Sequence, residues 1–400
     1  FYRYRTSCAR TSWVFLNIKE VRLTVMKFVV DSTTLTDSVN WVSRSLSTRP
    51  IMTALLGIVI DASSDVTLSA SDLETSAKSS FTAEIKEKGR VLVPGRLLAE
   101  ISRALPNKPV SFTLDGNRVL VTAGSAKFTL PTLPINEYPN LPTMPDTSGQ
   151  IASDVFATAI NQVAIAAGRD DSLPTLTGIH VDINKETITL AATDRYRLAV
   201  REINWTPNNP EETTTALLRA RTLADAARTI SSTKNISFAV APNTSNERLI
   251  GFTTEQKSMT SRQLDGTFPP YRHLLPSESI ATAVVEVATL LDSVRRVALV
   301  TDKTVPLRLK FTNNTLQLEA GAGDDAQATE EIQISYSGEP IDIAFNPTFL
   351  TDGLNALGTT YVNIAFTGSN KPAVLSGKNK ADGEIDGTYR YLLMPMRYAS

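Results

Sequence analysis

Three pairs of adjacent acidic residues are the side chains of this sequence with the clearest potential for chemistry. They are Asp170-Asp171, Asp324-Asp325 and Glu330-Glu331. Paired carboxylates can bind Mg²⁺ and so support phosphoryl chemistry, as in a metal-dependent nuclease. Each pair, however, stands in a polar turn without a neighbouring catalytic base. We therefore interpret all three pairs as solvated loops.

The sequence also lacks the usual patterns of nucleotide-binding and metal enzymes. It contains no P-loop and no G-x-G-x-x-G, and Gly321-Ala322-Gly323 leads into acidic residues rather than into a helix. Its only histidines are His180 and His273, and its only cysteine is Cys8, which are too few for a His/Cys metal site. We therefore predict a protein that is not an enzyme and that uses no cofactor and no metal ion.

The bulk composition limits the partners and the compartment. Lys and Arg number 40 and Asp and Glu 41, a formal net charge of −1, so nucleic-acid binding must rely on local basic patches. A single cysteine allows no disulfide framework within the chain and fits a reducing compartment. No apolar run reaches transmembrane length. We expect a cytoplasmic protein without membrane contact, and 400 residues favour two or three domains.

The first 25 residues differ from the rest of the chain. They hold five basic residues and one acid, Glu20. A targeting peptide would need an apolar h-region and a small-residue cleavage site, and neither is clear. We interpret residues 1–25 as an extension that is disordered or that precedes a natural start at Met26.

An internal repeat predicts the elements that must position any site. Residues 58–72, 178–194 and 307–321 each read as strand, turn and strand, followed by a small-residue or acidic turn. Leu68, Leu190 and Leu318 hold matching places in the three copies, 122 and 128 residues apart. Self-similarity at a fixed period indicates repeated structural units.

Two stretches with helical spacing flank each hairpin. Those before the hairpins are 35–46, 153–167 and 287–300, and those after them are 94–105, 219–230 and 346–357. Asn346 followed by Pro347 is typical of a capped helix start. Each module is therefore α+β, with two helices packed on antiparallel sheet. Pro-rich linkers separate the modules, which we predict at 26–146, 150–274 and 278–400.

Four segments carry a resemblance to a known family. They are Met26-Lys27-Phe28, Ala192-Thr193-Asp194-Arg195-Tyr196-Arg197-Leu198-Ala199-Val200, Phe268-Pro269-Pro270-Tyr271-Arg272 and Tyr391-Leu392-Leu393-Met394-Pro395-Met396-Arg397. In this order on a three-fold repeat, they resemble the bacterial DNA polymerase III beta subunit, the sliding clamp, from Met26 onwards. Residues 103–109 and 166–171 resemble its actinobacterial branch.

The resemblance implies a processivity factor of DNA replication. Two copies would join head to tail in a ring of six modules, with helices inside around duplex DNA and sheets outside. Implied partners are double-stranded DNA, the DNA polymerase III alpha subunit, the clamp loader, and other polymerases and repair proteins that bind through short linear peptides. During replication the ring would be associated with the nucleoid. Besides the nuclease, a diverged clamp paralogue acting as an interaction protein remains an alternative.

The resemblance also implies three sets of site residues. The dimer interface would use Phe128, Leu130, Leu299 and Val300. Contacts to DNA would use Arg49, Arg96, Arg103, Arg169, Arg219 and Arg221. The hydrophobic pocket for partner peptides would use Leu176, Thr193, Arg195, Tyr196, Arg197, Leu198, Pro269, His273, Leu274, Leu392, Met394, Pro395, Met396 and Arg397.

The sequence departs from better-known family members at several of these positions. Arg195 and Tyr196 replace a smaller pair, and His273 stands where the family often has a second arginine. Leu173-Pro174-Thr175 replaces aromatic residues that touch single-stranded DNA, so we do not carry that contact over. We expect a groove of altered shape and charge.

Overall fold

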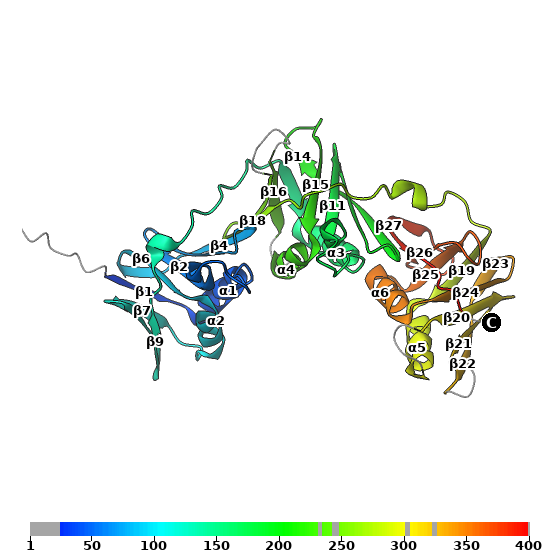
Figure 1. The fold of residues 1–400 in the computed structure, drawn as a ribbon, viewed down its shortest axis with the longest axis horizontal. Helices are drawn as coiled ribbons and strands as arrows, with labels where there is room; N and C mark the ends of the chain where they lie inside the picture. Colours follow the sequence, from blue (N-terminus) through cyan, green and yellow to red (C-terminus); the bar gives the residue numbers. More distant parts are fainter. Residues whose placement is uncertain (1–24, 231–233, 242–247, 301–304, 322–325, 399–400) are drawn as a thin grey trace, which may run out of the picture.

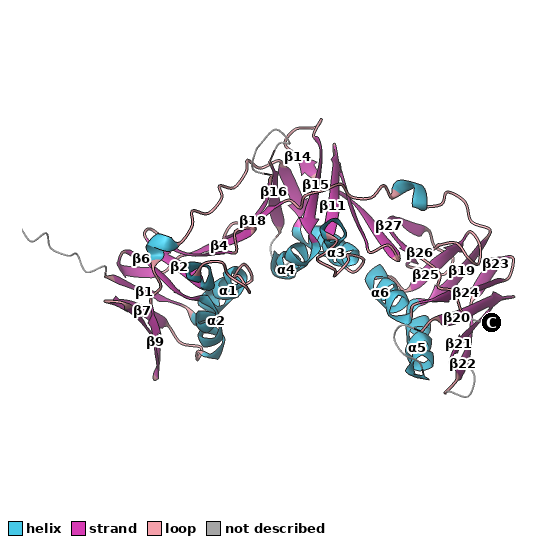
Figure 2. Ribbon diagram, in the orientation of Figure 1, coloured by secondary structure: helices cyan, strands magenta, loops and turns pink. Residues whose placement is uncertain are grey.

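The computed structural model describes residues 25–230, 234–241, 248–300, 305–321 and 326–398. The predicted extension, apart from Val25, and the pair Asp324-Asp325 lie outside these residues. The described chain forms an arc with its helices on the concave side and its sheets on the convex side (Figures 1 and 2). Within this part of the chain, no helix is long and apolar enough to span a membrane.

Each of the three modules contributes two helices to the concave side. The helices are α1 (Ser32–Ser43), α2 (Gly95–Ala104), α3 (Ser153–Ala164), α4 (Ala220–Ile230), α5 (Val287–Val297) and α6 (Pro347–Leu357). The side chain of Asn346 accepts hydrogen bonds from the backbone amides of Thr348 and Phe349, which confirms the predicted cap of α6. Helix α1 begins three residues earlier than predicted, because the Asp31 side chain caps the amide of Thr34.

Four antiparallel sheets form the convex side. The first has the order β5 (Glu84–Glu87), β1 (Met26–Val30), β7 (Val110–Asp115), β8 (Arg118–Ala123), β9 (Ala126–Pro131). The second has the order β14 (Thr206–Pro207), β10 (Gly149–Ala152), β16 (Asn235–Val240), β17 (Leu249–Thr253), β18 (Lys257–Arg262), β4 (Thr75–Phe81), β3 (Val66–Ser71), β2 (Gly57–Ala62), β6 (Gly89–Pro94). The third has the order β15 (Thr213–Arg219), β11 (Gly178–Asn184), β12 (Thr187–Thr193), β13 (Arg197–Asn204), β27 (Ile385–Leu393), β26 (Ala373–Lys378), β25 (Tyr361–Phe366), β19 (Ala281–Glu286), β23 (Ser335–Gly338). The fourth has the order β22 (Ala328–Gln333), β21 (Thr315–Ala320), β20 (Leu307–Thr312), β24 (Ile341–Phe345).

The two nine-stranded sheets join neighbouring modules. At the first junction β18 pairs with β4, and at the second junction β13 pairs with β27. In each case five strands of one module continue into four strands of the module beside it. One continuous sheet therefore crosses each junction, and its backbone hydrogen bonds fix the angle between neighbouring modules.

The core lies between the helices and the inner faces of the strands. Leu68, Leu190 and Leu318, which mark the repeat in the sequence, are all fully buried there. The predicted fold class is confirmed: three α+β modules, each with two helices on antiparallel sheet. Smaller apolar clusters also form on the other side of the sheets, under the linkers that follow the first two modules.

Candidate functional site

The turn Thr193–Arg197, which we call the second-junction turn, lies at the boundary between the second and third modules. The Asp194 carboxylate accepts hydrogen bonds from the backbone amides of Tyr196 and Arg197, both at 3.0 Å. The Thr193 hydroxyl donates to the carbonyl of Arg197 at 2.7 Å. Arg195 takes a φ of +79°, a left-handed conformation. These bonds fix the turn and leave the Tyr196 side chain 61% exposed.

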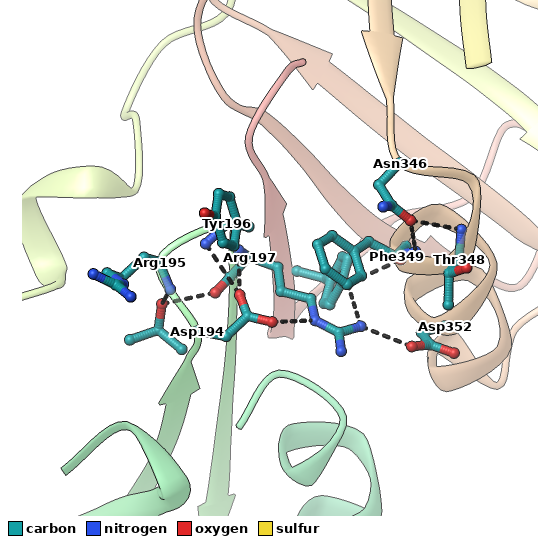
Figure 3. Close-up of polar contacts among 10 residues, drawn as sticks. Asp194, Arg195, Tyr196, Arg197, Asn346, Thr348, Phe349 and Asp352 are labelled. Carbon is teal, nitrogen blue, oxygen red and sulfur yellow. Dashed lines mark hydrogen bonds and ion pairs between the residues drawn. The ribbon is translucent and has the colours of Figure 1, made fainter. Parts of the chain in front are cut away.

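Arg197 ties the two modules together (Figure 3). Its guanidinium is buried and forms ion pairs with Asp194 at 2.9 Å and with Asp352 of α6 at 2.8 Å. It also lies over the ring of Phe349, 4.2 Å from the centroid. Burial alone would disfavour the charge, but Tyr391 and the two carboxylates outweigh it and raise the pKa of Arg197 above its usual value. The side chain is therefore a fixed cation.

A pocket of about 350 Å³ opens beside this cation. Its lining comes from the loop after α3, from the second-junction turn and from the first turns of α6: Ala167, Gly168, Arg169, Asp170, Leu173, Leu176, Asp194, Arg195, Tyr196, Arg197, Thr348, Phe349 and Asp352. Leu176, Arg195, Tyr196 and Arg197 were predicted as pocket residues. Phe349 and Asp352 were not, because the sequence reveals a capped helix after Asn346 but not which junction it faces.

The segment Met394–Arg397 runs along the third-module side of this site. The Met394 amide donates to the carbonyl of Tyr196 at 2.9 Å, and the Met396 amide donates to the carbonyl of Ala344 at 2.8 Å. Met394 is 38% exposed, and Pro395 and Met396 are half-buried. The structure thus brings these residues next to the second-junction turn, although the 350 Å³ pocket itself is not lined by them.

The remaining predicted pocket residues lie on the convex side. Leu198 and Leu392 are opposite each other on β13 and β27 and are buried in a cluster with Phe268 and Tyr271. Pro269, His273 and Leu274 are exposed on the linker above that cluster. Leu198 and Leu392 are therefore buried in this convex-side cluster and do not line the 350 Å³ pocket.

Three of the six arginines predicted to contact DNA come together on the concave side. Arg169, Arg219 and Arg221, joined by Arg228, line a groove of about 750 Å³ between the ends of α3 and α4. Arg219 forms an ion pair with Glu74 at 2.8 Å. The groove and the pocket share a wall made of Ala167, Gly168, Arg169 and Asp352. The other three predicted arginines, Arg49, Arg96 and Arg103, are exposed elsewhere on the first module.

The residues predicted for a dimer interface lie at the two ends of the arc. Phe128 on β9 is half-buried, whereas Leu130 is fully buried in the core of its own module. The Leu130 side chain therefore packs within its own module in the single chain, and its place in an interface would be through the backbone of β9. At the other end, Leu299 is 83% exposed and Val300 is half-buried just after α5.

One member of each described acidic pair is bound by neighbouring side chains or backbone, and Glu330-Glu331 lies on strand β22 rather than in the predicted loop. Asp170 accepts hydrogen bonds from Ser172, which lower the pKa of Asp170. Glu330 is bound by Arg296 and Ser293, and these contacts lower the pKa of Glu330. Within the described ranges, no group of three or more His, Cys, Asp and Glu side chains is arranged to hold a metal ion. Asp324 and Asp325 lie outside those ranges.

Comparison with known proteins covers nearly the whole described chain. Residues 26–142, 150–270 and 272–397 match the N-terminal, central and C-terminal domains of the DNA polymerase III beta subunit. The beta sliding clamp of Streptomyces coelicolor is 48% identical over 93% of this chain and 99% of its own length. The beta sliding clamp of Micrococcus luteus is 44% identical over 77% of this chain and 98% of its own. A crystal structure of the Pseudomonas aeruginosa sliding clamp bound to griselimycin, 25% identical, superposes with a TM-score of 0.83 over 93% of this chain and all of that one.

Proposed function

The chain belongs to the family of DNA polymerase III beta subunits and is a sliding clamp, a processivity factor without catalytic activity of its own; from this premise we propose how its residues act. Two copies close head to tail around duplex DNA, the concave arginines contact phosphates, and the pocket at the second junction binds peptide segments of the polymerase. The actinobacterial relatives agree with the branch that the sequence resembles. We place the protein in the cytoplasm, at the nucleoid during replication.

The ring is supported by the number of strands in the two sheets that do not span a junction. The chain ends its arc with a five-stranded sheet at one end and a four-stranded sheet at the other. At both internal junctions, five strands join four to make nine. If β9 of one copy pairs with β22 of a second copy, each contact between chains repeats that arrangement. Two such contacts close a ring of six equivalent modules and leave neither edge strand unpaired.

The internal junctions also give the expected register between chains. At the first junction Met259 lies opposite Ala77, and at the second Tyr391 lies opposite Ala199. The strand pairing within each module shows which residues are equivalent. Phe128 on β9 is equivalent to Met259 and Tyr391. Ala328 on β22 is equivalent to Ala77 and Ala199. Phe128 should therefore face Ala328 of the partner subunit, with Leu299 and Val300 nearby.

A cross-linking experiment tests this register. Directly opposed residues in antiparallel strands have Cβ atoms roughly 4.5–5.5 Å apart, close enough for a short cross-linker. Phe128→Cys combined with Ala328→Cys, in a Cys8→Ser chain, should yield a covalent dimer in high yield. Lys127→Cys with Ala328→Cys is the matched control, because its side chain points to the other face of β9. Equal cross-linking of both pairs would contradict the register.

The arginine groove supports a DNA contact that allows movement. Guanidinium groups that meet phosphates position a duplex but read no sequence, so the ring can slide. Arg169, Arg219 and Arg221 lie on the concave side with the helices, and we assign Arg49, Arg96 and Arg103 to the same surface. Because a net charge of −1 offers no bulk attraction to DNA, these local groups must supply it.

The pocket beside Arg197 supports peptide binding. Aromatic and aliphatic walls from Tyr196, Phe349 and Leu176 suit apolar anchors, and adaptable methionines stand beside them. We propose the DNA polymerase III alpha subunit as its main partner, with the clamp loader, other polymerases and repair proteins as competitors for the same site.

Retention on DNA circles tests the whole proposal. After treatment with a clamp loader and ATP, the protein should stay bound to nicked circular DNA and be lost when the circle is cut. Only a closed ring predicts both results. Equal loss from intact and linear DNA would favour a clamp paralogue that binds partners but does not encircle DNA.

A further inference from the structure

Tyr398, the residue that follows Met394–Arg397, contacts the fourth sheet. The Tyr398 hydroxyl donates to the Asp342 carboxylate at 2.8 Å. The Arg308 guanidinium lies over the Tyr398 ring, 4.8 Å from the centroid, and also donates to Asp342 at 2.9 Å. We call Tyr398, Arg308 and Asp342 the tyrosine clasp. It lies on the face of the fourth sheet away from the core.

The clasp continues a strand-like pairing. The Met396 amide bonds to the carbonyl of Ala344 on β24, and two residues further on Tyr398 meets Asp342, two residues earlier on β24. This spacing is that of an antiparallel pair, in which every second side chain lies on the same face. Strand β24 has β20 on one side only, so the segment covers its other edge.

Two hydrogen bonds hold the backbone of this segment. In the described residues its backbone is bonded at Met394 and at Met396, and Pro395 has no amide hydrogen to donate. Fixing a backbone residue costs about 1–2 kcal/mol of conformational entropy. A peptide that binds Met394 and Met396 bears this cost unless the segment is already ordered, because preorganisation lowers the cost of binding.

We propose that Tyr398 is a positioning residue of the peptide site. Through Arg308 and Asp342 it fixes Met394–Arg397 on β24 before any partner arrives. This inference rests on the proposed peptide-binding function of the second junction. Tyr398 itself need not touch the partner.

The test measures binding of the Streptomyces coelicolor DNA polymerase III alpha subunit to immobilised dimer by surface plasmon resonance. Tyr398→Ala removes the ring and the hydroxyl, each worth a modest interaction, and should raise the Kd about fivefold. Tyr398→Phe keeps the ring under Arg308 and should recover most of that loss. Tyr336→Ala is the matched control, because it also removes a tyrosine of the third module, one that stacks on Phe311 and bonds to the carbonyl of Glu339 outside the clasp. Its Kd should equal that of the unaltered protein.

A double-mutant cycle separates positioning from a general structural effect. If Tyr398 acts through the methionines, Tyr398→Ala should add less than a twofold change in a chain that already carries Met394→Ala and Met396→Ala. An undiminished effect in that background, or an unchanged Kd for Tyr398→Ala in the normal one, would overturn the inference. The S. coelicolor clamp is the positive control. If it binds the alpha subunit and the unaltered protein does not, the proposed peptide function fails instead.

Discussion

The turn Ser71–Thr75 at the first junction and the turn Thr193–Arg197 at the second have the same backbone. In both, an aspartate side chain accepts from the amides two and three residues ahead, through Asp72 in the first and Asp194 in the second. In both, a hydroxyl bonds to the carbonyl that ends the turn. The middle residues Leu73 and Arg195 have φ values of +78° and +79°.

The side chains on this shared backbone differ. Glu74 forms an ion pair with Arg219, whereas Tyr196 at the matching position lies by Phe349, 6.4 Å between ring centroids. The neighbouring strand supplies Arg262 at the first junction and Met394 at the second, each bonded to its turn through the backbone amide. The repeat therefore supplies the same backbone at both junctions, but an aromatic pair, Tyr196 with Phe349, stands at the second where the first has the ion pair of Glu74 with Arg219.

The largest difference should appear when the last residue of each turn is replaced. Arg197→Leu leaves the carboxylates of Asp194 and Asp352 without their buried cation and should cost about 3 kcal/mol of unfolding free energy. Thr75→Val, the matched change, removes one hydroxyl bond to Asp72 and should cost about 1 kcal/mol. Urea unfolding of both variants checks this. Equal losses would mean that the Arg197 ion pairs contribute nothing beyond one ordinary hydrogen bond.

The next effect concerns binding rather than stability. Met394→Ala with Met396→Ala removes two apolar groups at the second junction, and the Kd for the polymerase alpha subunit should rise roughly 10- to 100-fold while the ring stays dimeric. Arg262→Ala, the matched change at the first junction, should leave the Kd unchanged. Titration and gel filtration measure both. An unaltered Kd in the methionine variant would remove these residues from the peptide site.

The sequence predicted the repeat and the helices well, because both depend on local patterns. Leu68, Leu190 and Leu318 recur at matching places, and Asn346-Pro347 marks the start of a helix. It failed where contacts join distant segments. Nothing local places Phe349 and Asp352 around Arg197, since they lie more than 150 residues apart along the chain. Likewise, Leu130 and Phe128 alternate with exposed residues in the same way, and only the packing of the sheet shows that one of them is fully buried.

A smaller effect should follow when glycine replaces the residue with positive φ in each turn. Arg195→Gly and Leu73→Gly both remove the strain of a side chain at positive φ, partly offset by the flexibility of glycine in the unfolded chain, so each should stabilise the protein by about 0.5–1 kcal/mol. Only Arg195 lines the pocket, so only Arg195→Gly should change the Kd for the alpha subunit. The two changes in Tm and the two Kd values check this. A higher Kd in the Leu73→Gly variant would show that the two junctions are not independent.

The smallest effect should be a pH dependence that only the second junction has. On the convex side His180 stacks on Phe268, 5.1 Å between ring centroids, whereas Val59 fills the matching place at the first junction. Burial lowers the pKa of His180. The charge of Arg272 lowers it further, and the charge of Asp182 opposes the shift. The folded state therefore resists protonation, so stability is complete above the unfolded pKa of about 6.5 and declines as the pH falls below it.

His180→Val introduces the residue found at the matching position of the first junction, and it should remove the loss of stability at low pH. The Tm of the unaltered protein should therefore fall more steeply than that of His180→Val between pH 7.5 and about pH 5.5, while the two curves run parallel above pH 7.5. Val59→Ala is the matched control, because it weakens the corresponding cluster without changing any titratable group. Its Tm should be lower at every pH, with the same slope as the unaltered protein. Parallel curves for His180→Val and the unaltered protein over the whole range would show that His180 does not cause the pH dependence of stability.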